Sequence, residues 1–267
     1  MTRLAAAVSC AFLGISASNP LCAKEQVDLE LVLAVDVSMS MDADEIGLQR
    51  QGYVEAFRSP DVIHAILQNG EGKIVVTYME WAGETHVRFA VPWRLIDSAA
   101  AANRFADELE DLVPTRVDRT SISNALAAAG QAIEDNRWEG LRKVIDLSGD
   151  GPNNDGVPLP GIRDELVVRG ITINGLALMV NPGSQSLGID NLDEYYAQCA
   201  IGGSGSFVLP VRDWSQFSSG LRLKLHLEIT GRQLPAQIIP AAVSAPVDCL
   251  IGEKIWRDFL RRIGGRG

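Results

Sequence analysis

The regular alternation of strand-like and helix-like segments is the feature that most constrains the fold of this chain. Leu29 to Val35 is a continuous apolar run with one acid, which is typical of a strand buried on both faces. Further strands are expected at 73–82, 86–91, 144–147, 171–179 and 206–211, and helices at 42–57, 98–112, 121–135, 162–169, 192–199 and 213–230. This order predicts a mostly parallel sheet with helices on both faces.

The predicted fold class is therefore α/β, a three-layer, doubly wound, mostly parallel sheet with one antiparallel edge strand. The antiparallel pair is expected at 73–82 and 86–91, because a short turn at Gly83-Glu84 separates the two strands. With 267 residues, 46% of them apolar, the chain can bury one full core. We expect one domain over residues 24–231.

The first 23 residues have the pattern of a secretion signal. Arg3 supplies the positive charge, Leu4 to Ile15 form a short apolar stretch, and small residues follow up to Ala23. The apolar stretch is too short for a membrane-spanning helix. The pattern predicts a periplasmic or secreted protein, and the alternatives are lipid attachment at Cys22 or a buried N-terminal helix.

Removal of such a signal leaves two cysteines, Cys199 and Cys249. In an oxidising compartment this pair predicts one disulfide, which would tie residues 232–267, a Pro-rich tail, to the domain. Two free buried thiols are the alternative.

The end of the chain is predicted to be an amphipathic helix. Apolar side chains recur every four residues, at Ile251, Ile255, Phe259 and Ile263, and basic side chains face away from them, at Lys254, Arg257, Arg261 and Arg262. Two interpretations remain open: the helix docks on the domain, or it contacts a membrane surface or a partner. The net charge of −10 argues against nucleic acid as a partner, since nucleic-acid binding needs a basic face.

Oxygen-bearing side chains follow two of the expected strands. Asp36, Ser38 and Ser40 follow the first strand, Asp150 follows the strand at 144–147, and Thr120 directly precedes the helix at 121–135. In open α/β sheets, ligands bind beyond the carboxyl ends of the strands. No His, Cys or Lys joins these residues, and carboxylates and hydroxyls suit Mg²⁺ or Mn²⁺ better than zinc or copper.

These segments, in this order, resemble the metal-ion-dependent adhesion site (MIDAS) of von Willebrand factor A (vWA) domains. The resemblance implies that Ser38, Ser40 and Thr120 bind the cation directly, and that Asp36 and Asp150 act through water or by orienting the hydroxyls. Neutral hydroxyl ligands leave the cation electrophilic, so that an acidic group of a partner can complete its coordination. The expected function is thus an exported binding module, not an enzyme, whose partner protein presents a carboxylate. The resemblance requires no second copy of the chain for folding.

More narrowly, the sequence resembles the DUF1194 family of exported bacterial proteins. The resemblance is carried by residues 33–40, by Ser148 to Asn154, by Tyr195-Tyr196 followed by Cys199, and by residues 201–203. One departure from many A domains is Gly149, which stands before Asp150 where those domains have Thr.

The main alternative function is a Mg²⁺-dependent phosphatase resembling the haloacid dehalogenase superfamily, with Asp36 as nucleophile and residues 149–155 as the late acidic loop. Three details oppose it: Ser38 replaces the second Asp, Asn154 stands where an acid is expected, and no Lys stands out in a loop between the two motifs. A vWA-type domain without metal is a further alternative, in which these Asp and Ser residues cap helices and turns and Thr120 is a helix N-cap.

Overall fold

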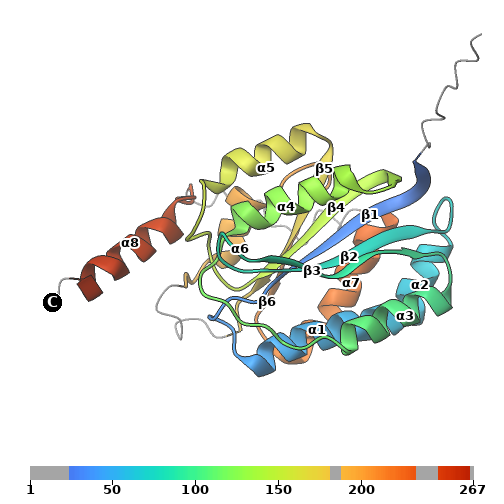
Figure 1. Cartoon of the computed structure of the whole chain (residues 1–267), viewed down its shortest axis with the longest axis horizontal. Helices are drawn as coiled ribbons and strands as arrows, with labels where there is room; N and C mark the ends of the chain where they lie inside the picture. The colour runs from blue at the N-terminus through green and yellow to red at the C-terminus, as the bar shows by residue number, and fades with distance from the viewer. Residues whose placement is uncertain (1–23, 181–187, 233–245, 265–267) are drawn as a thin grey trace, which may run out of the picture.

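The computed structural model describes residues 24–180, 188–232 and 246–264. The predicted signal segment and most of the Pro-rich segment lie outside these residues. Six strands form one sheet in the order β3-β2-β1-β4-β5-β6 (Figure 1). Their bounds are β1 (Glu25–Asp36), β2 (Ile74–Trp81), β3 (Val87–Ile96), β4 (Trp138–Gly149), β5 (Ile171–Leu178) and β6 (Val208–Val211). Only the edge strand β3 pairs antiparallel, with β2, so the predicted fold class is confirmed.

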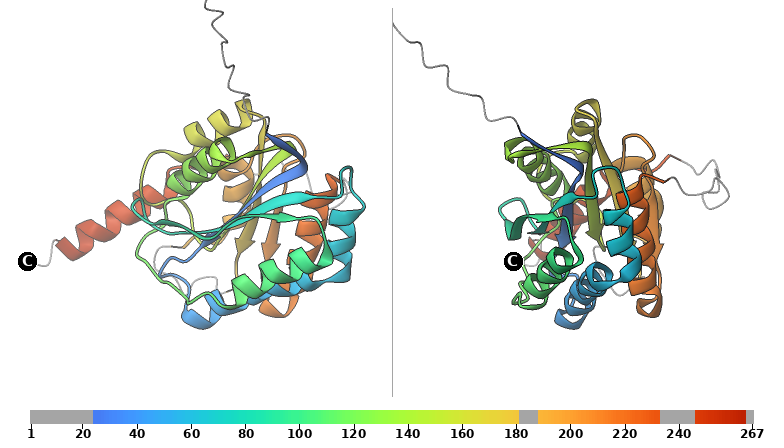
Figure 2. Two further views of the ribbon diagram at one scale, coloured as in Figure 1. Left: turned by 45° about the vertical axis from the view of Figure 1, so that its right-hand side comes forward. Right: turned by 90° about the vertical axis from the view of Figure 1, so that its right-hand side faces the viewer.

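Helices cover both faces of the sheet, which gives three layers (Figure 2). One apolar core lies under α1 (Ala43–Arg58), α2 (Pro60–Leu67), α3 (Ala99–Glu110) and α7 (Phe217–Thr230). The other lies under α4 (Ile122–Asp135), α5 (Leu159–Val168), α6 (Leu192–Tyr195) and the π-helical turn η1 (Tyr196–Ala200). Leu31 and Leu33 of β1 point into the first core, and Val32 and Ala34 point into the second. Burial on both faces explains the continuous apolar run of β1.

Several elements differ in extent from the sequence prediction; β3, for example, ends at Ile96 rather than at residue 91. The short helix α2 was not predicted; it begins at Pro60, directly after Ser59 in extended conformation, because proline is well suited to the first position of a helix. β4 begins at Trp138 rather than at residue 144, since its first half is only partly buried and lacks an apolar run. The helix expected from residue 213 starts with a 3₁₀ turn (Trp214–Gln216) before α7.

The last helix, α8 (Ile251–Gly264), projects from the body of the molecule (Figure 1). A disulfide between Cys199 of η1 and Cys249 precedes it, with the two Cα atoms 5.5 Å apart. The predicted disulfide is confirmed, and it joins the tail to the domain. Gly252 is the one buried residue of α8, so the predicted docking applies to its first turns only. Within the described residues, no helix has the length and apolarity needed to cross a membrane.

Candidate metal site

The predicted oxygen-bearing residues meet where β1 and β4 end. These strands are parallel neighbours, and Val35 of β1 lies in register with Ser148 of β4. The loops that follow both strands therefore leave the sheet side by side. Tertiary pairing brings Asp36 and Asp150 together although 114 positions separate them in the chain.

A continuous chain of hydrogen bonds links four of the predicted residues. The backbone N–H of Ser38 donates to Asp36 Oδ1 at 2.7 Å. The hydroxyls of Ser38 and Ser40 are 2.7 Å apart, and Ser40 Oγ donates to Asp150 Oδ1, also at 2.7 Å. The N-cap Asp42 accepts from the backbone of Glu45 at 2.8 Å, which starts α1 and ends this loop.

Thr120 is brought to the same place by two sets of backbone contacts. Val117 pairs with the first loop, accepting from Met39 N at 3.0 Å. Asn154 then fixes Thr120 itself, because its side chain accepts from Thr120 N at 3.0 Å and its own N–H donates to Thr120 O at 2.8 Å. The Thr120 hydroxyl lies 3.9 Å from the point that a Cβ on Gly151 would occupy, so it faces the Asp150 loop.

The helix-capping alternative for Thr120 is wrong. Ser121 occupies the N-cap position of α4, and its side chain accepts from Asn124 N at 3.4 Å. Thr120 is the residue before the cap and is 4% exposed. Its hydroxyl is thus not used as the N-cap of α4.

The loop after β4 is braced by contacts that the sequence did not reveal. Asp155 accepts from Arg119 Nη1 and from the backbone of Glu84, both at 2.8 Å. Arg119 has a positive φ of 71°, which is uncommon outside glycine and turns the chain toward Thr120. In the phosphatase alternative this loop would supply an acid for Mg²⁺, but the Asp155 carboxylate is engaged by these two donors.

The residues of the site differ in exposure, from the buried carboxylate of Asp36 to the exposed hydroxyl of Ser40. Asp36 is fully buried, and its Oδ2 atom has no hydrogen-bond partner among the described residues, whereas Ser40 is exposed. Burial, and secondly the charge of the nearby Asp150, raise the pKa of Asp36 well above its ordinary value, while hydrogen bonds from Ser38 and from the backbone of Asp150 act in the opposite direction. A cation beside these carboxylates would offset both unfavourable effects.

The residues present fit a hard divalent cation. The donor set is made of three hydroxyls and two carboxylates, all oxygen, which is the preference of Mg²⁺ and Mn²⁺. Across the described residues, no group of three or more His, Cys, Asp or Glu side chains could hold a metal ion. Any ion at this site must therefore rely on the hydroxyls of Ser38, Ser40 and Thr120, with Asp36 and Asp150 supplying the negative charge.

Tyr196 lies in a segment that carries the resemblance to the DUF1194 family, but no sequence pattern indicates a role for it at this site. Tyr196 is fully buried, and its hydroxyl has no hydrogen-bond partner among the described residues. A Cβ added to Gly149 would lie 2.7 Å from this hydroxyl and 2.9 Å from Asp36 Oδ2. The only signal in the sequence was Gly149 itself, the departure from the usual pattern before Asp150.

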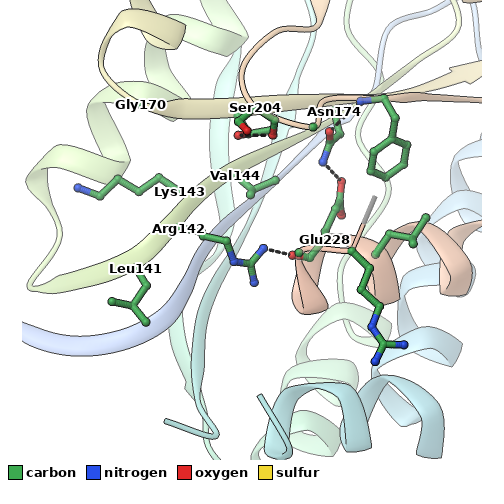
Figure 3. Close-up of a pocket in the computed structure, with 14 residues that line it drawn as sticks. Leu141, Arg142, Lys143, Val144, Gly170, Asn174, Ser204 and Glu228 are labelled. Atoms are coloured by element: carbon green, nitrogen blue, oxygen red, sulfur yellow. Dashed lines mark hydrogen bonds between the residues drawn. The ribbon is translucent and has the colours of Figure 1, made fainter. Parts of the chain in front are cut away.

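A cavity lies away from the candidate metal site, at the amino-terminal end of β4 and β5 and beside the C-terminus of α7 (Figure 3). Its volume is about 300 Å³. At its wall, Asn174 Nδ2 donates to Glu228 Oε1 at 2.9 Å, and Arg142 donates to the last carbonyls of α7. Behind Glu228, the buried Lys224 ammonium lies 2.6 Å from Asp146 and 2.5 Å from Glu228.

The sheet order, the layers and the oxygen-lined site after β1 define a vWA-type domain. The chain belongs to the family described as "Protein of unknown function (DUF1194)", which it matches over residues 26–233. No curated protein is significantly similar in sequence.

Solved structures support the fold. Proximal thread matrix protein 1 from the mussel byssus, with a zinc-occupied MIDAS motif, is 18% identical with a TM-score of 0.53, and the match covers 76% of this chain and 48% of that one. The pilus adhesin SpaC from Lactobacillus rhamnosus GG is 12% identical with a TM-score of 0.54, covering 78% and 32%. An aerotolerance-related membrane protein from Bacteroides fragilis is 16% identical with a TM-score of 0.50, covering 76% and 100%. The matched part spans about half or less of the first two proteins.

Proposed function

We propose that this protein is an exported binding module that holds one Mg²⁺ or Mn²⁺ ion at the end of β1 and uses it to bind an acidic group on a partner protein. The observation that carries the proposal is the chain of oxygens from Asp36 through Ser38 and Ser40 to Asp150, with Thr120 held beside it. The zinc-occupied MIDAS motif of the mussel protein supports a divalent cation at this place in the fold.

The chemistry of the donors favours binding over catalysis. Ser38, Ser40 and Thr120 are neutral, so a cation bound to them keeps much of its charge and attracts a carboxylate from outside. Among the described residues at the site there is no histidine or lysine, and the nearby Arg116 and Arg119 bond to Met39 O and to Asp155. Asp36 is buried behind the serines and orients the loop through its bond to Ser38 N.

The surroundings suit a protein partner. Ser40 lies at the surface, so one side of the cation faces solvent. Met39, between the two serines, is 53% exposed and offers an apolar contact next to the charged centre. Exposed apolar side chains beside a polar centre are a common feature of protein interfaces. Export is supported by the N-terminal signal pattern and by the disulfide, which forms and persists in oxidising compartments.

The test is calorimetric titration of Mg²⁺ and of Mn²⁺ into the chelator-treated protein. Asp36→Ala and Thr120→Ala are expected to weaken Mn²⁺ binding at least tenfold. Thr115→Ala is the matched control, because this threonine lies in the same connection but bonds to Glu80 Oε2 at 2.8 Å instead of facing the site. Its affinity should equal that of the wild type.

Two results would contradict the proposal. Mn²⁺ affinity that is unchanged in both Asp36→Ala and Thr120→Ala would place the ion elsewhere. Phosphate release from a generic phosphomonoester that depends on Mg²⁺ and on Asp36 would favour the phosphatase alternative. A carboxylate probe tests the second half of the proposal: acetate added to the Mn²⁺-loaded protein should displace bound water and lower the water-proton relaxation rate.

A further inference from the structure

Several buried polar atoms have no hydrogen-bond partner among the described residues, and two of them, Asp36 Oδ2 and the hydroxyl of Tyr196, face Gly149. Both side chains are fully buried. A buried polar group that lacks a partner is energetically costly and calls for an explanation, such as a bound ion or a donor that reaches it in another state. Two such atoms next to one site call for a common explanation.

The two atoms face the same gap. The point that a Cβ on Gly149 would occupy is 2.7 Å from the Tyr196 hydroxyl and 2.9 Å from Asp36 Oδ2. Any side chain at position 149 would fill this gap and push the two atoms aside. Glycine at position 149 leaves this gap open, and the hydroxyl of Tyr196 reaches it from another element.

The turn that contains Tyr196 is joined covalently to the tail. Tyr196 begins the turn η1, which also contains Cys199, and the disulfide to Cys249 leads directly into α8. The first turn of α8 contacts the loop after β4, where Glu253 Oε1 accepts a hydrogen bond from Asn153 Nδ2 at 2.8 Å. Turns of π type are frequent at functional sites. The disulfide thus joins two segments that both contact the loops of the candidate metal site.

We propose that Tyr196 is a positioning residue of the metal site, whose hydroxyl donates to Asp36 Oδ2 when the cation is bound. Asp36 Oδ1 already accepts from Ser38 N at 2.7 Å, so a second donor on Oδ2 would fix the carboxylate plane and, through Ser38, the first ligand hydroxyl. This inference rests on the proposed metal-binding function and adds to it the residue that orients the buried carboxylate.

A purely structural role for Tyr196 makes different predictions. Its ring packs against β5, since a Cβ added to Gly175 would lie 2.9 Å from Tyr196 Cδ1. Tyr196→Phe keeps this ring and removes only the hydroxyl. If the hydroxyl positions Asp36, metal affinity falls and the thermal stability of the metal-free protein does not, because the deleted group has no partner there.

The experiment is calorimetric Mn²⁺ titration of the full chain with its disulfide intact, together with thermal unfolding in chelator. Tyr196→Phe is expected to bind Mn²⁺ 10- to 100-fold more weakly, the usual effect of removing a group that orients a metal ligand, with an unchanged or higher Tm without metal. Tyr78→Phe is the matched control: Tyr78 is also a buried tyrosine, in β2, and packs in the other core. Its Mn²⁺ affinity should not change.

Gly149→Ala provides a second, independent variant. Its Cβ fills the gap between the two atoms, so Mn²⁺ affinity should fall. Adding Tyr196→Phe should cause little further loss, because both changes remove the same contact between the hydroxyl and Asp36. Equal Mn²⁺ affinity of Tyr196→Phe and wild type would overturn the inference and leave the proposed function intact. Loss of metal-free stability in Tyr196→Phe, in proportion to its loss of affinity, would overturn it in favour of packing. A wild-type protein that binds no Mn²⁺ would overturn both proposals.

Discussion

Ser40 Oγ donates a 2.7 Å hydrogen bond to Asp150 Oδ1 across 110 positions of the chain. It joins the loop after β1 to the loop after β4, and it holds the exposed end of the candidate site. Because β1 and β4 are adjacent and parallel, this contact depends on the sheet rather than on either loop alone.

This contact predicts strong coupling between the two residues in metal binding. Ser40→Ala and Asp150→Asn should each weaken Mn²⁺ binding at least tenfold, and the double variant should lose less than the sum of the two losses. Residues that act on one ligand typically show coupling of about 0.5–3 kcal/mol. Calorimetric titration of the four proteins measures the coupling, and strictly additive losses would show that the two side chains act separately.

The buried charges at the far end of α7 predict a pH-dependent stability. One ammonium, Lys224, faces two carboxylates, and burial, followed by the effect of Asp146, raises the pKa of Glu228 from 4.5 to about 7, against the lowering effects of Lys224 and Asn174. Between these two values the folded protein keeps a proton that the unfolded chain has lost, so stability falls as the pH rises from about 4.5 to 7.

Glu228→Gln should therefore reduce this fall. The expected difference in unfolding free energy between pH 5 and pH 8 is smaller in Glu228→Gln by about 1–3 kcal/mol, and urea unfolding at both pH values measures it. Glu165→Gln is the control, since that side chain is 65% exposed. An identical pH profile for Glu228→Gln and wild type would show that Glu228 is ionised throughout this range.

The disulfide predicts a large stability effect. Cys199 and Cys249 are 50 positions apart, and cross-linking a loop of that length stabilises by about 4 kcal/mol in the chain-entropy account. Cys199→Ser combined with Cys249→Ser should lower the unfolding free energy by about 2–4 kcal/mol, as measured by urea unfolding. Reductant added to the wild type should produce the same shift, and a shift in only one of the two experiments would contradict this account.

Two glycines of α8 predict where this helix contacts the domain. A Cβ on Gly252 would lie 2.1 Å from the carbonyl oxygen of Asn153, whereas a Cβ on Gly264 meets nothing within 4 Å. Alanine is usually favoured over glycine in helices by up to about 1 kcal/mol, so Gly264→Ala should be neutral or stabilising. Gly252→Ala should instead detach the first turn of α8.

Fluorescence of Trp256, which lies 5.0 Å from the guanidinium of Arg119, reports on this contact. The emission should change in Gly252→Ala and not in Gly264→Ala. If the two variants have the same emission, the first turn of α8 accommodates the extra methyl group without leaving the domain. Contact of the distal half of α8 with a membrane surface or a partner stays a prediction, and the exposed Leu260 and Ile263 are the residues on which it depends.

Local sequence patterns were sufficient for most of the fold. β1 was recognisable because its residues are buried on both faces, and α1 because Asp42 and Glu45 form its capping box. The first half of β4 was missed because it is partly exposed and has no periodic signal. The helix α2 was missed because it is short and begins at Pro60.

What the sequence alone determined was the fold class, the cysteine pair outside the predicted signal segment and the oxygen-bearing residues Asp36, Ser38, Ser40, Thr120 and Asp150, because strand and helix periodicity and residue chemistry are local properties. Only the tertiary structure decided which of these side chains contact one another and which buried residues lie next to them. The parallel pairing of β1 with β4 joins Ser40 to Asp150, and the packing of η1 against the sheet brings the Tyr196 hydroxyl beside the Gly149 gap. Contacts between residues more than 100 positions apart depend on the packing of the whole domain, and no local pattern in the chain encodes them.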